Sequence, residues 1–136
     1  MRLNPYLMFD GKCEAAFRFY EQALGGTIVA MMTYADTPAA EHTSPEARGK
    51  IIHARLAVGD TVLMGSDAPI ERYEKMQGFS VTLNIDESAE AERVFAALGA
   101  GGAVTMPIQE TFWARRFGML IDRFGTPWMI NCEKPM

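Results

Sequence analysis

An internal repeat constrains the fold of this chain more than any other feature of its sequence. With a shift of 76 residues and no gap, Phe19 meets Phe95, and Gly25-Gly26 meets Gly101-Gly102. Chance rarely keeps aromatic residues and glycine pairs in register together, so the match indicates an internal duplication. We therefore expect two units that share one order of strands and helices.

The first half of the chain predicts one helix and four strands. The helix covers 13–24, where apolar residues recur at helical spacing, and it ends at Gly25-Gly26. Segments with the composition of strands are 4–9, 27–34, 50–58 and 61–66. The last two strands are separated by Gly59-Asp60, a pair typical of a hairpin turn.

The second half predicts the same order. Strands are expected at 79–85 and 103–113, and a closing hairpin at 117–133. A helix at 88–98 lies between the first two strands, with Ser88 as its N-cap. The sequence thus predicts an α+β fold in which two βαβββ units form a curved mixed sheet around a cleft.

We expect the first unit to span 1–67 and the second to span 79–136, with 68–78 as the linker, all within one structural domain. The segment 35–49 is long for a connection in a compact domain, so it is expected to be a lid or to be disordered.

Charge and hydropathy exclude several classes of partner. The net charge of -4 argues against binding to nucleic acid, which needs a basic surface. No apolar run is long enough to span a membrane, and the N-terminus lacks the features of a signal peptide, so a cytoplasmic location is expected. Cys13 and Cys132 lie in apolar contexts and are predicted to be buried thiols.

Alternation along the strands predicts which side chains face the cleft. In 79–85 the odd-numbered residues are apolar and should pack on the helix, so the polar set faces the cleft: Ser80, Thr82 and Asn84. The shift of 76 transfers this face to Asn4, Tyr6 and Met8. The two hairpins also align with each other, which pairs Met64 with Met129 and Ser66 with Asn131 as inward-facing residues.

The segment 109–118, QETFWARRFG, predicts one wall of the cleft and its rim. Gln109 and Glu110 are neighbours on a predicted strand, so one of them should enter the cleft. Trp113 is the best candidate for stacking on an organic ligand, whereas Trp128 is expected in the core. Arg115-Arg116 is predicted to form the turn to the next strand, paired with Glu110 or Asp122 or solvated.

His53 is the only histidine inside a predicted strand. As a general base it would need a partner acid, and Asp67 at the end of the same hairpin is a candidate. The simpler alternative is a histidine that forms hydrogen bonds within the sheet.

Two segments of the chain resemble a known family. The run NPYLMFDGKCEAAFRFYEQALGG at 4–26, together with QETFWARRFGMLIDRFGTPWMIN at 109–131, is similar to the PhnB-like branch of the vicinal oxygen chelate superfamily. That superfamily includes glyoxalases, bleomycin resistance proteins and dioxygenases, and the branch is often labelled 3-demethylubiquinone-9 3-methyltransferase. The resemblance implies the glyoxalase-like fold and a homodimer.

The resemblance also implies where a metal would bind. Metal-using members take ligands from the first and last strands of each unit, which map here to Asn4, Met64, Ser80 and Met129. None of these is a histidine or a carboxylate, which a divalent cation in such a site requires. We therefore expect no metal at the usual site.

Three functions remain open. The first is a small-molecule binding protein without a metal or other cofactor, with a pocket lined by Tyr6, His53, Met64, Ser80, Thr82, Trp113, Met129 and Asn131. If it catalyses a reaction, the best candidates are His53 and Glu110. The second is a metal-dependent lyase, isomerase or dioxygenase with non-standard ligands from His53, Asp67, Glu110 or Asp122. The third is a methyltransferase. The absence of a Gly-rich motif after the first strand argues against it.

Overall fold

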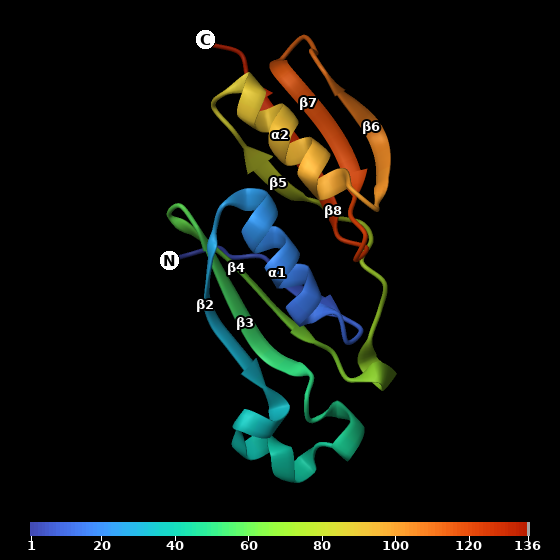
Figure 1. Ribbon diagram of the computed structural model, residues 1–136. Coiled ribbons are helices and arrows are strands. Elements are labelled where there is room, and N and C mark those ends of the chain that lie inside the picture. Colours follow the sequence, from blue (N-terminus) through green and yellow to red (C-terminus); the bar gives the residue numbers. More distant parts are fainter. Residues whose placement is uncertain (136) are drawn as a thin grey trace. The chain divides into compact units, whose positions relative to one another are not determined.

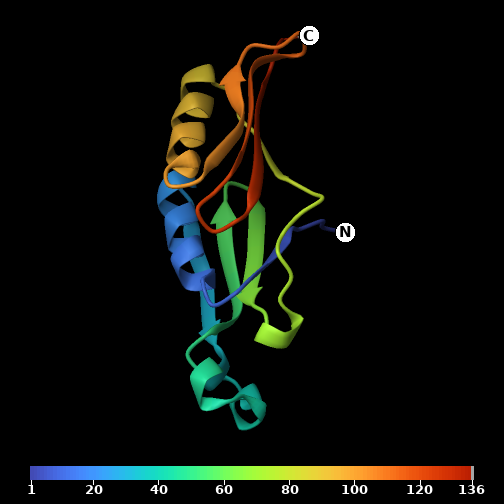
Figure 2. The same ribbon diagram turned by 90° about the vertical axis from the view of Figure 1, so that its right-hand side faces the viewer.

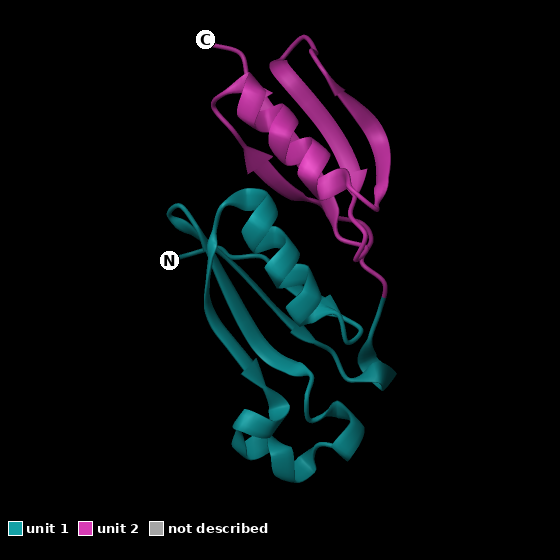
Figure 3. Ribbon diagram, viewed as in Figure 1, with its two compact units in different colours: residues 1–74 teal, residues 75–136 magenta. Residues whose placement is uncertain are grey.

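A computed structural model describes residues 1–135 of the chain. They divide into two compact units, Met1–Glu74 and Lys75–Met136, shown in separate colours in Figure 3. Each unit contains one α-helix and one four-stranded sheet, so the predicted α+β fold with two βαβββ units is confirmed. Among the described residues, no helix is long and apolar enough to cross a membrane.

Unit 1 follows the predicted order. Its elements are β1 (Tyr6–Phe9), α1 (Cys13–Leu24), β2 (Thr27–Thr33), β3 (Ile51–Val58) and β4 (Thr61–Asp67). The strands lie in the order β1-β4-β3-β2, with β1 parallel to β4 and the other neighbours antiparallel. The helix α1 packs on one face of this sheet (Figures 1 and 2).

The core of unit 1 lies between α1 and its sheet. Leu7 and Phe9 of β1 and Phe17 and Tyr20 of α1 are all buried, and the rings of Phe9 and Phe17 pack edge-on with centroids 6.3 Å apart. Burial of each such large apolar side chain stabilises the fold by about 1.5–3 kcal/mol. The helix approaches β4 so closely that a Cβ atom added at Gly65 would lie 2.8 Å from the Phe17 ring. Glycine is therefore required at this position of β4.

Unit 2 repeats this topology. Its elements are β5 (Val81–Asn84), α2 (Ser88–Gly99), β6 (Ala103–Gln109), β7 (Ala114–Ile121) and β8 (Pro127–Glu133). The strand order is β5-β8-β7-β6, with β5 parallel to β8. The helix α2 packs on β7 and β8 (Figure 1).

The core of unit 2 contains Trp128, as predicted. Its side chain is 1% exposed, and its Nε1–H donates to the buried Asp122 carboxylate at 2.8 Å. The same carboxylate accepts backbone N–H groups of Phe124 and Thr126, which fixes the turn between β7 and β8. Asp122 therefore serves the turn and the core, and neither Arg115 nor Arg116 pairs with it.

The structure corrects the ungapped repeat alignment within the helices. The first helical hydrogen bond runs from Ala16 N–H to Lys12 in α1 and from Ala91 N–H to Glu87 in α2, a shift of 75 rather than 76. Burial agrees, because Tyr20 and Phe95 are both buried whereas Phe19 is half-exposed. In the strands the pair Tyr6–Met64 corresponds to Thr82–Met129, a shift of 76, so the path from this strand position to the helix is one residue longer in unit 1 than in unit 2.

Three local predictions in unit 2 are wrong. The N-cap of α2 is Glu87, and the Ser88 hydroxyl instead lies 3.8 Å from the Cys132 sulfur. The strand β6 ends at Gln109, because Thr111 and Ala114 bond to each other in a tight turn. Arg115-Arg116 consequently belongs to β7 and does not form the turn.

The segment 35–49 is folded into short helical turns rather than disordered. These are η1 (Tyr34–Asp36), η2 (Pro38–His42) and η3 (Pro45–Ala47). Thr33 caps the first turn through a capping box with Asp36, and Thr37 caps the second. The Tyr34 hydroxyl donates to the backbone carbonyl of Asp67, which ties this segment to the end of β4.

Both cysteines are buried free thiols, as predicted. Burial, together with the nearby Asp67 and Glu14 carboxylates, raises the pKa of the Cys13 thiol.

Candidate functional site

Each sheet has a second face that its own helix does not cover, here called its open face. In unit 1 the parallel register pairs Tyr6 with Met64 and Met8 with Ser66. All four side chains lie on the open face, because the residues that alternate with them, Leu7 and Phe9 among them, are buried. The prediction that Tyr6, Met8, Met64 and Ser66 share one face is confirmed.

His53 joins this open face beside Tyr6. The Tyr6 hydroxyl lies 3.2 Å from His53 Nδ1, and the two rings stack with centroids 5.7 Å apart. The hypothesis that Asp67 is the partner acid of His53 is wrong. The Asp67 carboxylate is buried and accepts the backbone N–H groups of Cys13 and Ile51, each at 2.9 Å. The partner of His53 is therefore a phenol rather than a carboxylate.

Arg55 also lies on this face, and the sequence analysis missed it. It pairs with Met64 across the sheet, and its neighbours Ala54 and Leu56 are buried. Its Nη1 lies 3.8 Å from the Met64 sulfur, which is a weak acceptor. The signal was available, because Arg55 follows His53 by two residues and must share its face if His53 is in a strand.

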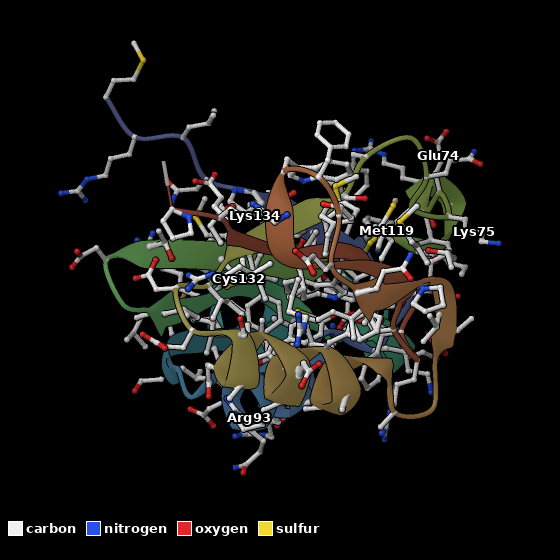
Figure 4. All side chains as sticks on the ribbon, turned by 90° about the horizontal axis from the view of Figure 1, so that it is seen from above. Glu74, Lys75, Arg93, Met119, Cys132 and Lys134 are labelled. Atoms are coloured by element: carbon white, nitrogen blue, oxygen red, sulfur yellow. The ribbon has the colours of Figure 1, made fainter. Side chains whose placement is uncertain are left out.

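Unit 2 presents the same register with different side chains. Thr82 pairs with Met129, and Asn84 pairs with Asn131. These pairs occupy the positions of Tyr6–Met64 and Met8–Ser66, so the strand and hairpin alignments made from the sequence are confirmed. Met119 of β7 lies next to Met129 on this face, on the opposite side of the sheet from Arg93 of α2 (Figure 4).

Aromatic side chains extend the open face of unit 2. Phe117 of β7 pairs with Asn131. Trp113, in the turn before β7, packs edge-on against Phe117 with centroids 5.3 Å apart, and Phe112 packs against Trp113 at 4.8 Å. Trp113 remains 44% exposed and Phe112 is 90% exposed, so these rings offer apolar surface to a ligand.

Asn131 carries an unsatisfied polar atom in this setting. Its Nδ2 group donates to Asn84 Oδ1 at 3.1 Å. Its own Oδ1 is buried and has no hydrogen-bond partner among the described residues. Because a buried acceptor without a partner costs about 1–3 kcal/mol, a donor that reached Asn131 Oδ1 would stabilise this face.

Two predicted site residues do not join these clusters. Glu110 follows the end of β6 and forms an exposed salt bridge with Lys134 at 2.9 Å. This hydrogen bond lowers the pKa of the Glu110 carboxyl, so the group is a poor general base near neutral pH. Ser80 is half-buried and lies just before β5, outside the paired strand.

A separate cavity of about 750 Å³ lies in unit 1, beneath the helical turns of the segment 35–49. Its lining mixes charges of both signs, with Asp10, His42, Glu46, Lys50 and Glu71 among the wall residues. None of the open-face residues lines it. The sequence could not reveal this cavity, because its walls come from three connections that are far apart in the chain.

The residues proposed for a non-standard metal site do not provide a donor set. Among residues 1–135, no group of three or more histidine, cysteine or carboxylate side chains could hold a metal ion. Asp67 and Asp122 are buried and hydrogen-bonded within their own turns, and Glu110 pairs with Lys134. His53 is the one candidate that lies on an open face.

The fold also occurs in a protein that holds a metal. The fosfomycin resistance protein FosX from Listeria monocytogenes, in a structure complexed with Mn(II), superimposes with a TM-score of 0.67 at 7% identity, covering 98% of this chain and 93% of that chain. At this identity the likeness concerns the fold alone. The donors on the two open faces, one imidazole among thioethers, amides and hydroxyls, are not a set that such an ion prefers.

Closer relatives establish the family. A family model described as 3-demethylubiquinone-9 3-methyltransferase matches residues 1–131. Protein YjdN of Escherichia coli K12 is 34% identical over 98% of this chain and 97% of its own. Protein PA1353 from Pseudomonas aeruginosa superimposes with a TM-score of 0.91 at 48% identity, covering 99% of both chains. A PhnB protein from Bacillus cereus gives 0.80 at 25% identity, covering 97% of this chain and 99% of that chain. The chain therefore belongs to the 3-demethylubiquinone-9 3-methyltransferase family, in the PhnB-like branch of the vicinal oxygen chelate superfamily.

Proposed function

We propose that the protein binds small organic molecules on the open face of each sheet, without a metal ion or other cofactor. The observation that carries the proposal is the buried, unpartnered Oδ1 atom of Asn131 beside exposed aromatic and half-buried thioether side chains. Ligand sites of soluble proteins combine largely apolar walls with a few polar groups that fix orientation. The proposed binding residues are Tyr6, His53, Met64, Thr82, Trp113, Met129 and Asn131, and Ser80 is left out because it lies outside the paired strand.

On unit 2, we assign the apolar part of the ligand to the rings and thioethers. Trp113 presents a partly exposed ring held against Phe117, so stacking on it requires little further ordering of the side chain. Met119 and Met129 lie side by side on the same face, and thioether side chains adapt to ligands of irregular shape. A donor N–H or O–H of the ligand would satisfy Asn131 Oδ1.

Benzamide tests this arrangement, since it combines an aromatic ring with an amide donor. We expect it to bind, and Asn131→Ala to weaken the binding by about 3- to 10-fold through the loss of one hydrogen bond. Affinity is measured by NMR titration of the ¹⁵N-labelled protein. Gln22→Ala serves as the matched control, because Gln22 is an exposed amide side chain on α1. Equal affinity of Asn131→Ala and the wild type would remove Asn131 from the site.

The alternative function is a metal-dependent lyase, isomerase or dioxygenase, which the Mn(II) complex of FosX brings into consideration. On our proposal, Mn²⁺, Fe²⁺, Ni²⁺ and Zn²⁺ produce no saturable rise in the melting temperature, and protein purified without an affinity tag or chelator contains no stoichiometric metal. A rise that saturates at one ion per chain would favour the alternative. His53→Ala would then show whether the imidazole is a ligand.

The name of the matching family suggests a methyltransferase as a third candidate. S-adenosylmethionine is commonly bound at a Gly-rich loop after the first strand of a parallel, doubly wound sheet. Here the first strand leads to Asp10-Gly11-Lys12, and most strand neighbours are antiparallel. Titration with S-adenosylmethionine decides the point, and no binding is expected.

We also propose that the chain forms a homodimer. The resemblance to the superfamily suggests it, and the edge strand β6 exposes Val104 and Met106, which a second copy could cover. Sedimentation equilibrium gives the mass directly, and a value of one chain at all concentrations would contradict the proposal.

A further inference from the structure

We propose that the open face of unit 1 binds an organic oxyanion, such as a carboxylate, through Arg55, with Tyr6 and His53 beside it. This inference rests on the proposed function and specifies the chemical class of the ligand that binds the open face of unit 1. It concerns a residue that sequence patterns did not single out.

The first observation is the missing partner of Arg55. A guanidinium group carries five N–H donors, and here its acceptor within the described chain is one thioether sulfur, that of Met64, at 3.8 Å. No carboxylate among residues 1–135 forms an ion pair with Arg55. By contrast, the more exposed Arg18 and Arg93 pair with Glu14 and Glu90 on their own helices.

Burial makes this difference meaningful. Arg55 is half-buried, so part of its hydration is already lost, and a thioether returns little of that energy. An exposed arginine keeps its water and gains little from an ion pair. The arginine that would benefit most from an anion is thus the one that lacks an anionic partner within the described chain.

The surroundings of Arg55 select the charge of the ligand. The residues that share its row across the sheet are Ala30, Met64 and Tyr6, and the adjacent row contains His53 and Met32. None of them is a carboxylate. The whole chain carries a net charge of -4, which repels anions at a distance, so a local unpaired cation is needed to hold one.

Tyr6 and His53 can add a second donor. If the Tyr6 hydroxyl donates to His53 Nδ1, the proton of the neutral imidazole lies on Nε2. That N–H can then donate to an oxygen of the anion, while the guanidinium binds the same group with its planar pair of N–H donors. The exposed thioethers of Met8 and Met32 provide apolar surface for the rest of the ligand.

The test compares benzoate with neutral benzamide, which have the same ring. NMR titration should show that benzoate shifts the Arg55 Nε–H signal and the His53 ring signals. Arg55→Gln should weaken the binding of benzoate by at least about 10-fold and leave the affinity for benzamide unchanged. Arg18→Gln is the matched control and should change neither. Arg55→Lys keeps the charge but not the planar fork, so its affinity for benzoate should be intermediate. This variant provides the test if Arg55→Gln does not fold.

The outcomes separate this inference from the proposed function. If benzamide binds and benzoate does not, or if benzoate binds Arg55→Gln as tightly as the wild type, the oxyanion site is overturned while the proposed function stands. If neither compound binds the wild type, both proposals fail. If the Arg55→Gln variant loses the binding of benzoate but keeps that of benzamide, the oxyanion site and the proposed function are both supported.

Discussion

The open faces of the two units share a backbone design but not a chemistry. In both, the first strand runs parallel to the last, and the pairs Tyr6–Met64 and Thr82–Met129 occupy the same place. Unit 1 places a phenol, an imidazole and an unpaired guanidinium there, whereas unit 2 places amides, thioethers and aromatic rings. The two units have thus kept the same register between the first and last strands, because packing on the helix requires it. The side chains on the uncovered face have diverged.

The helix-facing sides differ much less, since both must exclude water. Ala16, Tyr20 and Ala23 of α1 correspond to Ala91, Phe95 and Leu98 of α2, and all six are buried. The correspondence needs a shift of 75 residues, while the strands that begin the two units correspond with a shift of 76. The chain therefore accommodates a one-residue difference between the first strand and the helix of the two units.

The largest effect is expected from substitutions that test this offset. Phe95→Ala and Tyr20→Ala should each lower the free energy of unfolding by about 3–5 kcal/mol, because both remove a buried aromatic ring. Phe19→Ala should cost much less, since Phe19 is half-exposed. Urea denaturation measures the three values. If Phe19→Ala were as destabilising as Phe95→Ala, the ungapped alignment would be right and the offset wrong.

The smallest effect concerns the exposed pair of Glu110 and Lys134. The salt bridge lowers the pKa of Glu110 below its value in the unfolded chain. The stability that it contributes is therefore present above the unfolded pKa and is lost as the pH falls through the folded pKa. Because the pair is exposed, Glu110→Gln should leave the melting temperature nearly unchanged at pH 7 and reduce only its slope between about pH 5 and pH 3.

A marked loss of stability at pH 7 in Glu110→Gln would show that this pair matters to the turn before β7. A loss of ligand affinity in the same variant would return Glu110 to the site, where sequence reasoning first placed it. Lys134→Gln is the matched control, because it removes the other half of the same pair.

The sequence predicted the parts of the fold that depend on local periodicity. Alternation along 79–85 and the shift of 76 correctly assigned Tyr6, Thr82 and Met129 to uncovered faces, because strand geometry alone decides which way successive side chains point. Trp128 was correctly assigned to the core, since it alternates with Met129.

What the sequence missed depends on contacts between distant residues. Asp67 seemed a partner for His53 because it is close in the hairpin, but its carboxylate is drawn to the backbone N–H groups of Cys13 and Ile51 on the other face. Glu110 and Trp113 were placed on a strand that ends at Gln109, because the turn is set by bonds between Thr111 and Ala114. The lack of an anionic partner for Arg55 could not be predicted from the sequence, because it depends on where the carboxylates lie in the folded chain.

The most direct test of the central claim is an NMR titration of ¹⁵N-labelled protein with assigned resonances, using benzamide and benzoate in turn. The account predicts that benzamide shifts the resonances of Trp113, Phe117 and Asn131, on the open face of unit 2. It predicts that benzoate instead shifts those of His53 and Arg55, on the open face of unit 1. Shifts confined to the helical turns of 35–49, or spread over α1 and α2, would contradict the assignment of ligand binding to the open faces.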